Sequence, residues 1–299
     1  MSTTMYSPLV YPQAAPGVAY SQPPIPPTYI QQVFSPLNWN PYSPNSVDRT
    51  FYWSDSNGTL TEQQVLALVQ GASGVAANQN NANATSCQTA ITNGFTALGY
   101  TITLSATDQA NGLAAYTSSQ QIVSNSKSWS NNASVVAFAS SILVNGNYYV
   151  CVQSGITGST QPVLGTTFNQ TYTDGNAAWQ YAGFLLGTTQ GNIWFTAQQV
   201  IQLYGQAVQF VSNNRIRYTN LSNTIKAIGS APSTWTADAT IALNSYIVIN
   251  SILYQATTAG ITGASLPSWN STVGTTVSDG TVVWTCMGNQ IGYIQSLTF

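Results

Sequence analysis

The stretch that decides the fold is TWTADATIALNSYIVINSILYQATTAGITGASLPSWNSTVGTTVSDGTVVWTCMG, residues 234–288. Most of it is spelled once before, in residues 128–183. The shared positions are an opening Trp, a Tyr, a Gly-Ile-Thr-Gly run, a Pro, an Asp-Gly pair, a Trp and a closing Gly, and they recur 105 or 106 residues apart. Because order and spacing agree over so many points, we infer two copies of one small domain.

Each copy is expected to be an antiparallel β-unit. In the later copy, two β-rich runs, 246–249 and 252–256, flank the pair Asn250-Ser251, and the earlier copy has Asn145-Gly146 at the same place. Such pairs favour tight turns because Gly, and to a lesser degree Asn or Asp, tolerates a positive φ. The pattern therefore predicts several short strands in each copy.

The two copies resemble a known kind of module. The residues that carry the resemblance are Trp235, Tyr254, Gly260-Ile261-Thr262-Gly263, Pro267, Asp279-Gly280, Trp284 and Gly288 in the later copy, and Trp129, Tyr149, Gly155-Ile156-Thr157-Gly158, Pro162, Asp174-Gly175, Trp179 and Gly183 in the earlier one. This order is similar to the small modules of bacteriophage tail-fibre and virion proteins and, more distantly, to the chitin-binding modules of secreted glycosidases. The resemblance covers somewhat over a third of the chain and implies a virion protein that contacts a host surface. The earlier copy departs from the later one in having Val163-Leu164 in place of Ser268-Trp269.

Composition excludes several classes of function. Only 4% of the 299 residues are charged, with five Lys and Arg and no His, against a usual charged fraction of about a quarter. Without a basic patch we expect no nucleic-acid partner. Without His, a Ser-His-Asp or Cys-His mechanism is impossible, and no residue cluster suggests a metal or another cofactor. Asp174 and Asp279 lie in equivalent Asp-Gly turns of separate copies, so a turn role is favoured over a glycosidase acid pair, and we expect no enzyme.

The sequence also bears on location. No signal-peptide pattern and no apolar run of about 18 residues is found, so we expect a protein made in the host cytoplasm and built into the virion. Cys87, Cys151 and Cys286 are expected to be free thiols, with an interchain bridge at Cys87 as the alternative.

Residues 1–48 hold ten of the 13 prolines. Proline fixes φ and removes a donor, so this segment is expected to be an extended arm that docks on another virion protein, such as the portal, an adaptor, the tail or the capsid. The expected anchoring residues are Tyr11, Tyr20, Tyr29, Phe34 and Trp39. A disordered leader is the alternative. Residues 49–60, with an Asn57-Gly58 turn, are expected to form a short hairpin.

Helical segments are expected to alternate with the two modules. Residues 61–127 are expected to be helical, with capping boxes at Thr61 and Ser105. A linker over 184–195, a helix over 196–229 and a terminal strand over 289–299 complete the chain, around module copies at 128–183 and 230–288. The fold class is therefore α+β, modular and fibrous.

The helix over 196–229 carries an apolar stripe with a 3.5-residue period and one polar layer. The stripe consists of Val200, Tyr204, Ala207, Val211, Asn214, Tyr218, Leu221, Ile225 and Ile228. This period favours a coiled coil between chains, and we expect a homotrimer. The alternative is an amphipathic helix that packs on its own chain.

Aromatic side chains are the remaining candidates for a binding site. The faces of Trp and Tyr stack on the apolar faces of sugar rings, while hydroxyl and amide groups supply directional hydrogen bonds. The candidates are Trp269, Tyr254, Trp235, Trp284, Tyr149 and Trp179. Trp269 and Tyr254 are preferred, because Trp235 and Trp284 can also be read as core residues.

These patterns together predict a tail or head fibre of a bacteriophage that presents its modules for attachment to the host, with a surface glycan as the ligand. The first alternative is a structural decoration or cement protein of the virion with no glycan ligand. The second is an adhesin or surface-layer protein of a cell.

Overall fold

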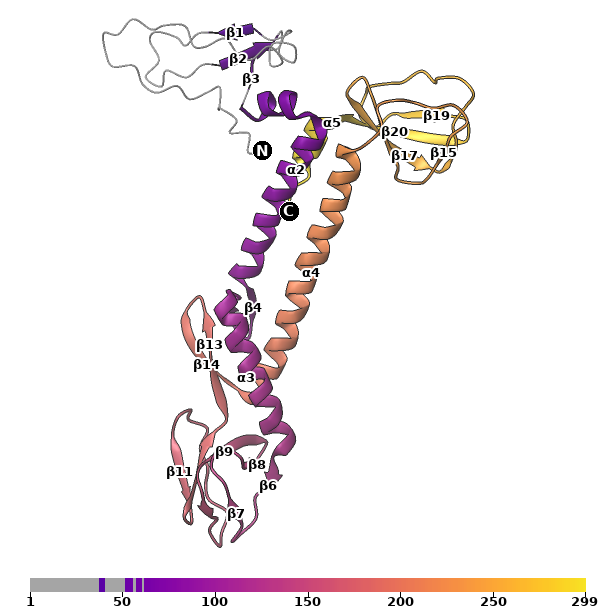
Figure 1. Ribbon diagram of the computed structural model, residues 1–299. Helices are drawn as coiled ribbons and strands as arrows, with labels where there is room; N and C mark the ends of the chain where they lie inside the picture. The colour runs from indigo at the N-terminus through magenta and orange to yellow at the C-terminus, as the bar shows by residue number, and fades with distance from the viewer. Residues whose placement is uncertain (1–37, 41–51, 56–57, 61) are drawn as a thin grey trace, which may run out of the picture. The chain divides into compact units, whose positions relative to one another are not determined.

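The structure is a computed structural model that describes residues 38–40, 52–55, 58–60 and 62–299, with side chains from residue 71 onward. Within these residues the chain is α+β, with four helices and several small, mainly antiparallel sheets (Figure 1). The helices are α2 (Glu62–Asn93), α3 (Ala106–Asn125), α4 (Ala197–Gly229) and α5 (Gln290–Ser296). The expected arm lies almost wholly outside the described residues, as do Tyr11, Tyr20, Tyr29 and Phe34.

A small antiparallel sheet precedes the first helix. It consists of β1 (Asn38–Asn40), β2 (Tyr52–Asp55) and β3 (Gly58–Leu60), in that order. The pairing of β2 with β3 confirms the hairpin expected over residues 49–60. Trp39, one of the expected anchoring residues, lies in β1 opposite Trp53 of β2.

The helices begin and change direction at residues that the sequence marks. Ser105 caps α3 in a capping box, accepting a hydrogen bond from the backbone N–H of Asp108 (3.1 Å) while the Asp108 carboxylate accepts one from the Ser105 backbone (3.1 Å). In α2, Gly71 has φ 66° and ψ −177°, so the helix is two segments joined at this residue. A left-handed φ is cheap only for Gly, which explains the residue type at this position.

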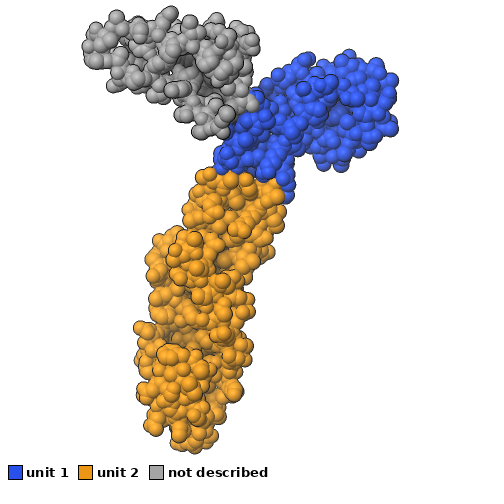
Figure 2. Space-filling model, viewed as in Figure 1, with its two compact units in different colours: residues 1–83, 220–298 blue, residues 84–219, 299 orange. Residues whose placement is uncertain are grey.

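The chain divides into two compact units, which Figure 2 colours separately. Unit 1 comprises residues 1–83 and 220–298, and unit 2 comprises residues 84–219 and 299. Both α2 and α4 contribute to each unit. Each unit contains one of the repeated domains, named here module 1 (residues 128–183, in unit 2) and module 2 (residues 234–288, in unit 1).

Unit 2 contains a sheet that the sequence did not indicate. The strands β4 (Phe95–Ala97), β5 (Tyr100–Ile102), β13 (Gly183–Thr188) and β14 (Gly191–Thr196) form it in the order β14-β13-β5-β4. The linker expected over 184–195 is therefore wrong. Phe195 and Leu186 of this hairpin pack with Val200 and Leu203 of α4, so the segment is part of a hydrophobic core.

Module 1 is an antiparallel sheet extended by one parallel strand. Its strands are β6 (Lys127–Ser128), β7 (Ser134–Val135), β8 (Ser141–Val144), β9 (Asn147–Gln153), β10 (Gly155–Ile156), β11 (Thr171–Asp174) and β12 (Ala177–Tyr181). The main sheet has the order β11-β12-β9-β8-β6, and β10 pairs with β7 in a second, two-stranded sheet. Strand β6 runs parallel to β8 and connects α3 to the module.

Module 2 has the same topology. Its strands are β15 (Thr240–Ile241), β16 (Tyr246–Ile249), β17 (Ile252–Thr258), β18 (Gly260–Ile261), β19 (Thr276–Asp279) and β20 (Val282–Asn289). The main sheet has the order β16-β17-β20-β19, and β15 pairs with β18. These strands follow the order of β8, β9, β12 and β11 and of β7 and β10, so the two copies share one fold.

Backbone angles confirm the equivalence of the modules at single residues. Positive φ occurs in pairs 105 or 106 residues apart, at Asn132 and Asp238, Phe138 and Asn244, Asn145 and Asn250, Asn169 and Gly274, and Gly175 and Gly280. A positive φ is uncommon outside Gly and Asn. Its recurrence at matched places shows that the loops, as well as the strands, follow the same path.

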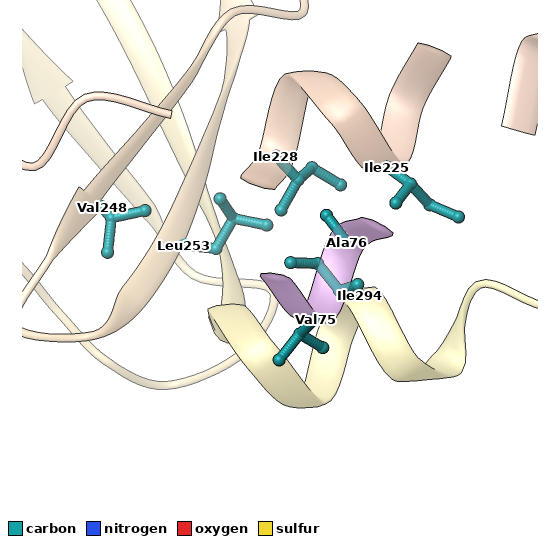
Figure 3. Packing of buried hydrophobic residues seen from close by; sticks show 7 residues of the cluster. All are labelled: Val75, Ala76, Ile225, Ile228, Val248, Leu253 and Ile294. Carbon is teal, nitrogen blue, oxygen red and sulfur yellow. The ribbon is translucent and has the colours of Figure 1, made fainter. Parts of the chain in front are cut away.

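The core of unit 1 packs α2, the last turns of α4 and α5 against module 2. Figure 3 shows its buried side chains converging from α2 (Val75 and Ala76), α4 (Ile225 and Ile228), the strands (Val248 and Leu253) and α5 (Ile294). The strand expected over 289–299 is wrong, because residues 290–296 form α5. Asn289 caps this helix by accepting from the Gly292 N–H (3.0 Å), and Ile291, Ile294 and Leu297 recur every three residues, which is a helical spacing.

The apolar stripe of α4 packs inside its own chain. Val200, Ile225 and Ile228 are at most 1% exposed, and the other six stripe residues are half-buried. In unit 2, Tyr204 stacks on Tyr116 of α3 with ring centroids 4.1 Å apart. The polar layer is also occupied, because Asn214 donates to the carbonyl of Phe210 (2.9 Å). The stripe is therefore the face on which α4 meets neighbouring segments of the same chain.

Candidate functional site

Each module is built around one buried aspartate. In module 1, Asp174 is 3% exposed, and its Oδ2 accepts hydrogen bonds from the indole N–H groups of Trp129 (2.8 Å) and Trp179 (2.9 Å). Its Oδ1 accepts a third from the backbone N–H of Gly158 (2.7 Å). A buried carboxylate is costly unless it is hydrogen-bonded, and these three donors meet that requirement.

Module 2 repeats this arrangement. Asp279 is 2% exposed, and its Oδ2 accepts from Trp235 (2.8 Å) and Trp284 (3.1 Å) while its Oδ1 accepts from Gly263 (2.8 Å). Sequence reasoning gave the aspartates a turn role only and missed these bonds. The shared spacing of Trp, Asp-Gly and Trp was the signal that could have revealed them. Because both oxygens are occupied by internal donors, neither carboxylate is placed to act on a substrate.

Four of the six aromatic candidates for sugar stacking lie inside the module cores. Tyr149, Trp179, Tyr254 and Trp284 are at most 1% exposed, so they serve the module cores and have almost no free ring surface to offer a ligand. These large rings fill cores that small sheets cannot otherwise fill. Burial also raises the pKa of Tyr149 and Tyr254 above the ordinary value.

Trp269 covers the core of module 2. Its ring lies over Tyr254 at 4.6 Å and near Trp284 at 6.1 Å between centroids, and its side chain is half-buried. Its indole N–H is buried and has no hydrogen-bond partner among the described residues. In module 1, Leu164 packs on the corresponding core. Trp269 thus closes a core in addition to any contact that it makes with a ligand.

The remaining candidate, Trp235, lines a groove where the end of α4 meets module 2. The cavity has a volume of ≈ 450 Å³, which is within the range of about 300–1,000 Å³ that is usual for small-molecule sites. It is lined by Ala227, Ser230, Ala231, Pro232, Thr234, Trp235, Thr236, Ala239, Ile241, Asn244, Ser245, Tyr246, Ile247, Thr262 and Trp284. None of these residues is charged.

Two half-buried aromatic side chains, Trp235 and Tyr246, give the groove its apolar walls. The N–H of Trp235 is bound to Asp279, so this residue contributes its ring to the groove. The Tyr246 hydroxyl accepts a hydrogen bond from the Gln255 amide (3.3 Å), and burial and the nearby Tyr293 raise its pKa. At neutral pH this hydroxyl keeps its proton and can donate it to a ligand. Sequence reasoning missed Tyr246 because it treated the residue only as part of a strand.

In the described part of the chain, no group of three or more His, Cys, Asp or Glu side chains could hold a metal ion. Among the described helices, none combines the length and apolar character needed to cross a membrane. Cys87, Cys151 and Cys286 are buried, free thiols, and burial raises the pKa of Cys151.

Comparison of the chain with protein-family models, with curated proteins and with solved structures found no significant match in any of the three.

Proposed function

We propose that this chain is a structural fibre protein of a bacteriophage virion and that module 2 attaches it to an uncharged saccharide of the host surface. The observation that carries the attachment is the groove beside Trp235 and Tyr246. It combines two aromatic walls with hydroxyl and amide groups and has no charged residue in its lining.

A saccharide fits the chemistry of this groove. Each sugar ring has an apolar C–H face, which stacks on an aromatic ring, and a rim of hydroxyl groups, which needs both donors and acceptors. Thr234, Thr236, Asn244 and Ser245 supply side chains of that kind along the groove. An anionic ligand would gain no compensating charge there, and a purely apolar ligand would leave these polar groups unpaired.

The virion part of the proposal rests on the sequence. The module pattern resembles that of phage fibre proteins, and residues 1–48 have the composition of an extended arm suited to docking on another virion protein. A chain with 4% charged residues also depends little on salt for its surface interactions.

We also propose a homotrimer, which would form through a surface other than the stripe of α4. Val200, Ile225 and Ile228 are buried in the cores of a single chain, so the stripe of α4 is already used. Sedimentation equilibrium decides the matter, because one chain has a mass of 31.8 kDa. A trimer would sediment with three times that mass, and a monomer would remove the trimer from the account.

One observation favours the alternative of a virion decoration protein without a glycan ligand. Tyr149, Trp179, Tyr254 and Trp284 serve the module cores, so conservation of the module pattern between the two copies is explained by folding alone. The groove is what separates the two functions.

A glycan array probed with the full chain tests the proposed attachment. Thr236 is exposed and lines the groove, so Thr236→Arg should fill the groove without disturbing the fold. Thr276→Arg is the matched control, because Thr276 is exposed on β19 of the same module and is not part of the groove. We expect the wild type and Thr276→Arg to be retained on an uncharged saccharide and Thr236→Arg to be retained about tenfold more weakly. If the wild type is retained on no saccharide, the decoration protein is the better account.

A further inference from the structure

One loop of module 1 displays a phenylalanine in a conformation that phenylalanine disfavours. Phe138 has φ 60° and leaves 81% of its side chain exposed. A bulky residue in the left-handed region is strained, and an exposed apolar ring gains nothing from folding. The backbone here is fixed by hydrogen bonds, since the N–H of Phe138 donates to the carbonyl of Cys151 (2.7 Å) and that of Ala137 donates to the Ser154 hydroxyl (2.8 Å). These hydrogen bonds explain the positive φ at position 138, but they do not explain why the residue there is a phenylalanine.

The same loop in module 2 carries Asn244, a residue that lines the groove. Asn244 has φ 66°, and its N–H donates to the carbonyl of Ala256 (2.9 Å), which is the counterpart of Cys151. Asn is among the residues that tolerate a left-handed φ best. Module 2 therefore has the residue that the backbone prefers, and module 1 has an aromatic ring in its place.

A second exchange between the modules concerns Tyr246. Strand β8 begins at Ser141 and β16 begins at Tyr246, and the two positions are equivalent because Ser141 pairs with Val150 and Tyr246 pairs with Gln255, 105 residues further on. Ser141 is buried and donates to the carbonyl of Ile122 near the end of α3 (3.2 Å). Tyr246 lies in the groove together with residues from the end of α4. In each module, the start of this strand is therefore close to the end of the helix that precedes the module.

The aromatic residue therefore stands at a different one of these two equivalent positions in each module, Tyr246 in module 2 and Phe138 in module 1. Both keep the opening tryptophan, Trp129 or Trp235, half-buried at this face and bound to the buried aspartate. In module 2, Asn244 and Tyr246 line the groove with this tryptophan. At the equivalent positions, module 1 has Phe138, which is exposed, and Ser141, which is buried. In module 1, the positions that match the groove lining carry no charge, as in module 2.

We propose that module 1 carries a second saccharide-binding site on the face that corresponds to the groove, with Phe138 as its stacking surface. This inference rests on the proposed function of module 2. A saccharide is the occupant because module 1 combines an aromatic ring with uncharged hydroxyl groups at the positions that match the groove. Ser128, Ser130 and Ser140 correspond to the groove residues Thr234, Thr236 and Ser245. The Phe138 ring has no hydroxyl, so this site discriminates less between sugars than the groove does.

Two sites on one chain change how strongly it holds a surface. A polymeric saccharide can occupy both modules, and the second contact forms at a high effective concentration once the first is made. Each site can then be weak by itself while the chain remains attached. The strain at Phe138 is accounted for by the contact that the ring makes with its ligand.

The test exchanges Phe138 for the residue that module 2 has at the same place. Phe138→Asn suits the positive φ and removes an exposed ring, so the variant should fold at least as stably as the wild type, which thermal unfolding checks. Retention of the full chain on an array of bacterial and synthetic polysaccharides is compared for the wild type, Phe138→Asn, Thr236→Arg and the double variant. We expect each single variant to lose retention about tenfold, as for the loss of one hot-spot contact, and the double variant to lose it completely.

The outcomes separate this inference from the proposed function. If Phe138→Asn is retained like the wild type while Thr236→Arg is lost, the groove of module 2 binds alone and the second site does not exist. If the wild type is not retained on any polysaccharide, the proposed attachment fails, and the second site fails with it. Val163→Asn is the control, because Val163 is 96% exposed on the same module and its exchange should change nothing.

Discussion

The indole N–H of Trp235 donates to Oδ2 of Asp279 over 2.8 Å, across 44 residues of sequence. Trp129 and Asp174 make the same bond at the same length in module 1. The bond fixes the opening residue of the module to the turn that precedes its last strand. The groove wall formed by Trp235 is therefore held by the core of the module, which makes the site rigid before any ligand arrives.

The buried carboxylate should be essential to module 2. In Asp279→Asn only one side-chain oxygen remains, so either the two indole N–H groups or the Gly263 N–H must lose an acceptor. Leaving buried donors unpaired costs about 1–3 kcal/mol each, so we expect unfolding of module 2 to become easier by about 2–4 kcal/mol in urea titrations. Asp238→Asn is the matched control, because Asp238 is exposed and has φ 51°, which Asn tolerates. Equal stability of the two variants would contradict the role of Asp279.

Trp269 should be replaceable by the residue of the other module. Trp269→Leu keeps an apolar cover over Tyr254 and removes an unpaired indole N–H, whereas Trp269→Ala opens the core. We expect the alanine variant to lose about 3 kcal/mol, near the lower end of the range for buried aromatic residues because Trp269 is only half-buried, and the leucine variant to lose less. If both variants unfold like the wild type, Trp269 is not a core residue, and a direct role in stacking on a sugar would be favoured.

The close approach of the helices in unit 1 depends on Gly229. A Cβ at this position would lie 2.6 Å from the Cβ of Ala76. Gly229→Ala should therefore destabilise unit 1 by about 1–3 kcal/mol, as overpacking does elsewhere. Gly205 lies in the same helix with nothing within 4 Å of its Cβ position, so Gly205→Ala should stabilise the helix by about 0.5–1 kcal/mol. Calorimetry measures the unfolding temperature of both variants. A shift of both in the same direction relative to the wild type would contradict this packing.

One carboxyl predicts how stability changes in acid. Partial burial of Asp108 raises its pKa, but hydrogen bonds from the Ser105 side chain, Thr103 and the Ser105 backbone outweigh burial and hold the pKa below its ordinary value of 3.8. Its stabilising contribution is thus complete above that value and is lost as the pH falls through the lower, folded pKa. Asp108→Asn should lower the unfolding temperature at neutral pH, and the difference from the wild type should shrink below about pH 4. A difference that stays constant to about pH 2 would show that the charge has no part in the cap.

Much of the fold could be predicted from spacing alone. The matched positions of Asn145-Gly146 and Asn250-Ser251, and of the two Asp-Gly pairs, identify turns because few residues accept a positive φ. The capping box at Ser105 could also be predicted, because its partner, Asp108, follows three residues later in the sequence. Turns and helix caps can be predicted in this way because their conformation depends on a few neighbouring residues.

What could not be predicted depends on contacts between distant segments. A 3.5-residue stripe indicates that α4 packs on another helix, but it does not say whether that helix belongs to the same chain. The burial of Val200 and Ile225 in two separate cores of one chain shows that the partner segments belong to the same chain. The same holds for Tyr254 and Trp284, since an aromatic residue in a strand can face either the core or the solvent until the register is known.

Two shorter segments were misassigned for a related reason. Residues 184–195 have an apolar run on each side of Gly191, Phe184–Leu186 and Ile193–Phe195, which suits a hairpin. The pairing of Thr188 with Ile102, however, joins segments far apart in the sequence. Residues 290–296 are too short for helical periodicity to stand out from strand alternation. The burial of Ile294 against Ile225 and Leu253 decides in favour of a helix.

Attachment through an uncharged groove should not depend on salt. Screening weakens contacts between exposed charges, with a Debye length of about 10 Å at 0.1 M. Retention of the full chain on its saccharide is therefore expected to be the same at low salt and at about 0.5 M salt. A steep loss of retention with salt would point to an anionic ligand bound by the few Lys and Arg residues, away from the groove.

Binding of a saccharide in the groove is tested most directly at Tyr246, the groove residue that module 1 replaces with Ser. Retention of the full chain on the glycan array is measured for the wild type, Tyr246→Phe and Tyr246→Ser, with circular dichroism and thermal unfolding to verify that each variant is folded. We expect Tyr246→Phe, which keeps the ring, to be retained within a few-fold of the wild type, and folded Tyr246→Ser to be retained about tenfold more weakly or worse. Equal retention of the wild type and Tyr246→Ser would contradict the claim that the groove of module 2 binds the host saccharide.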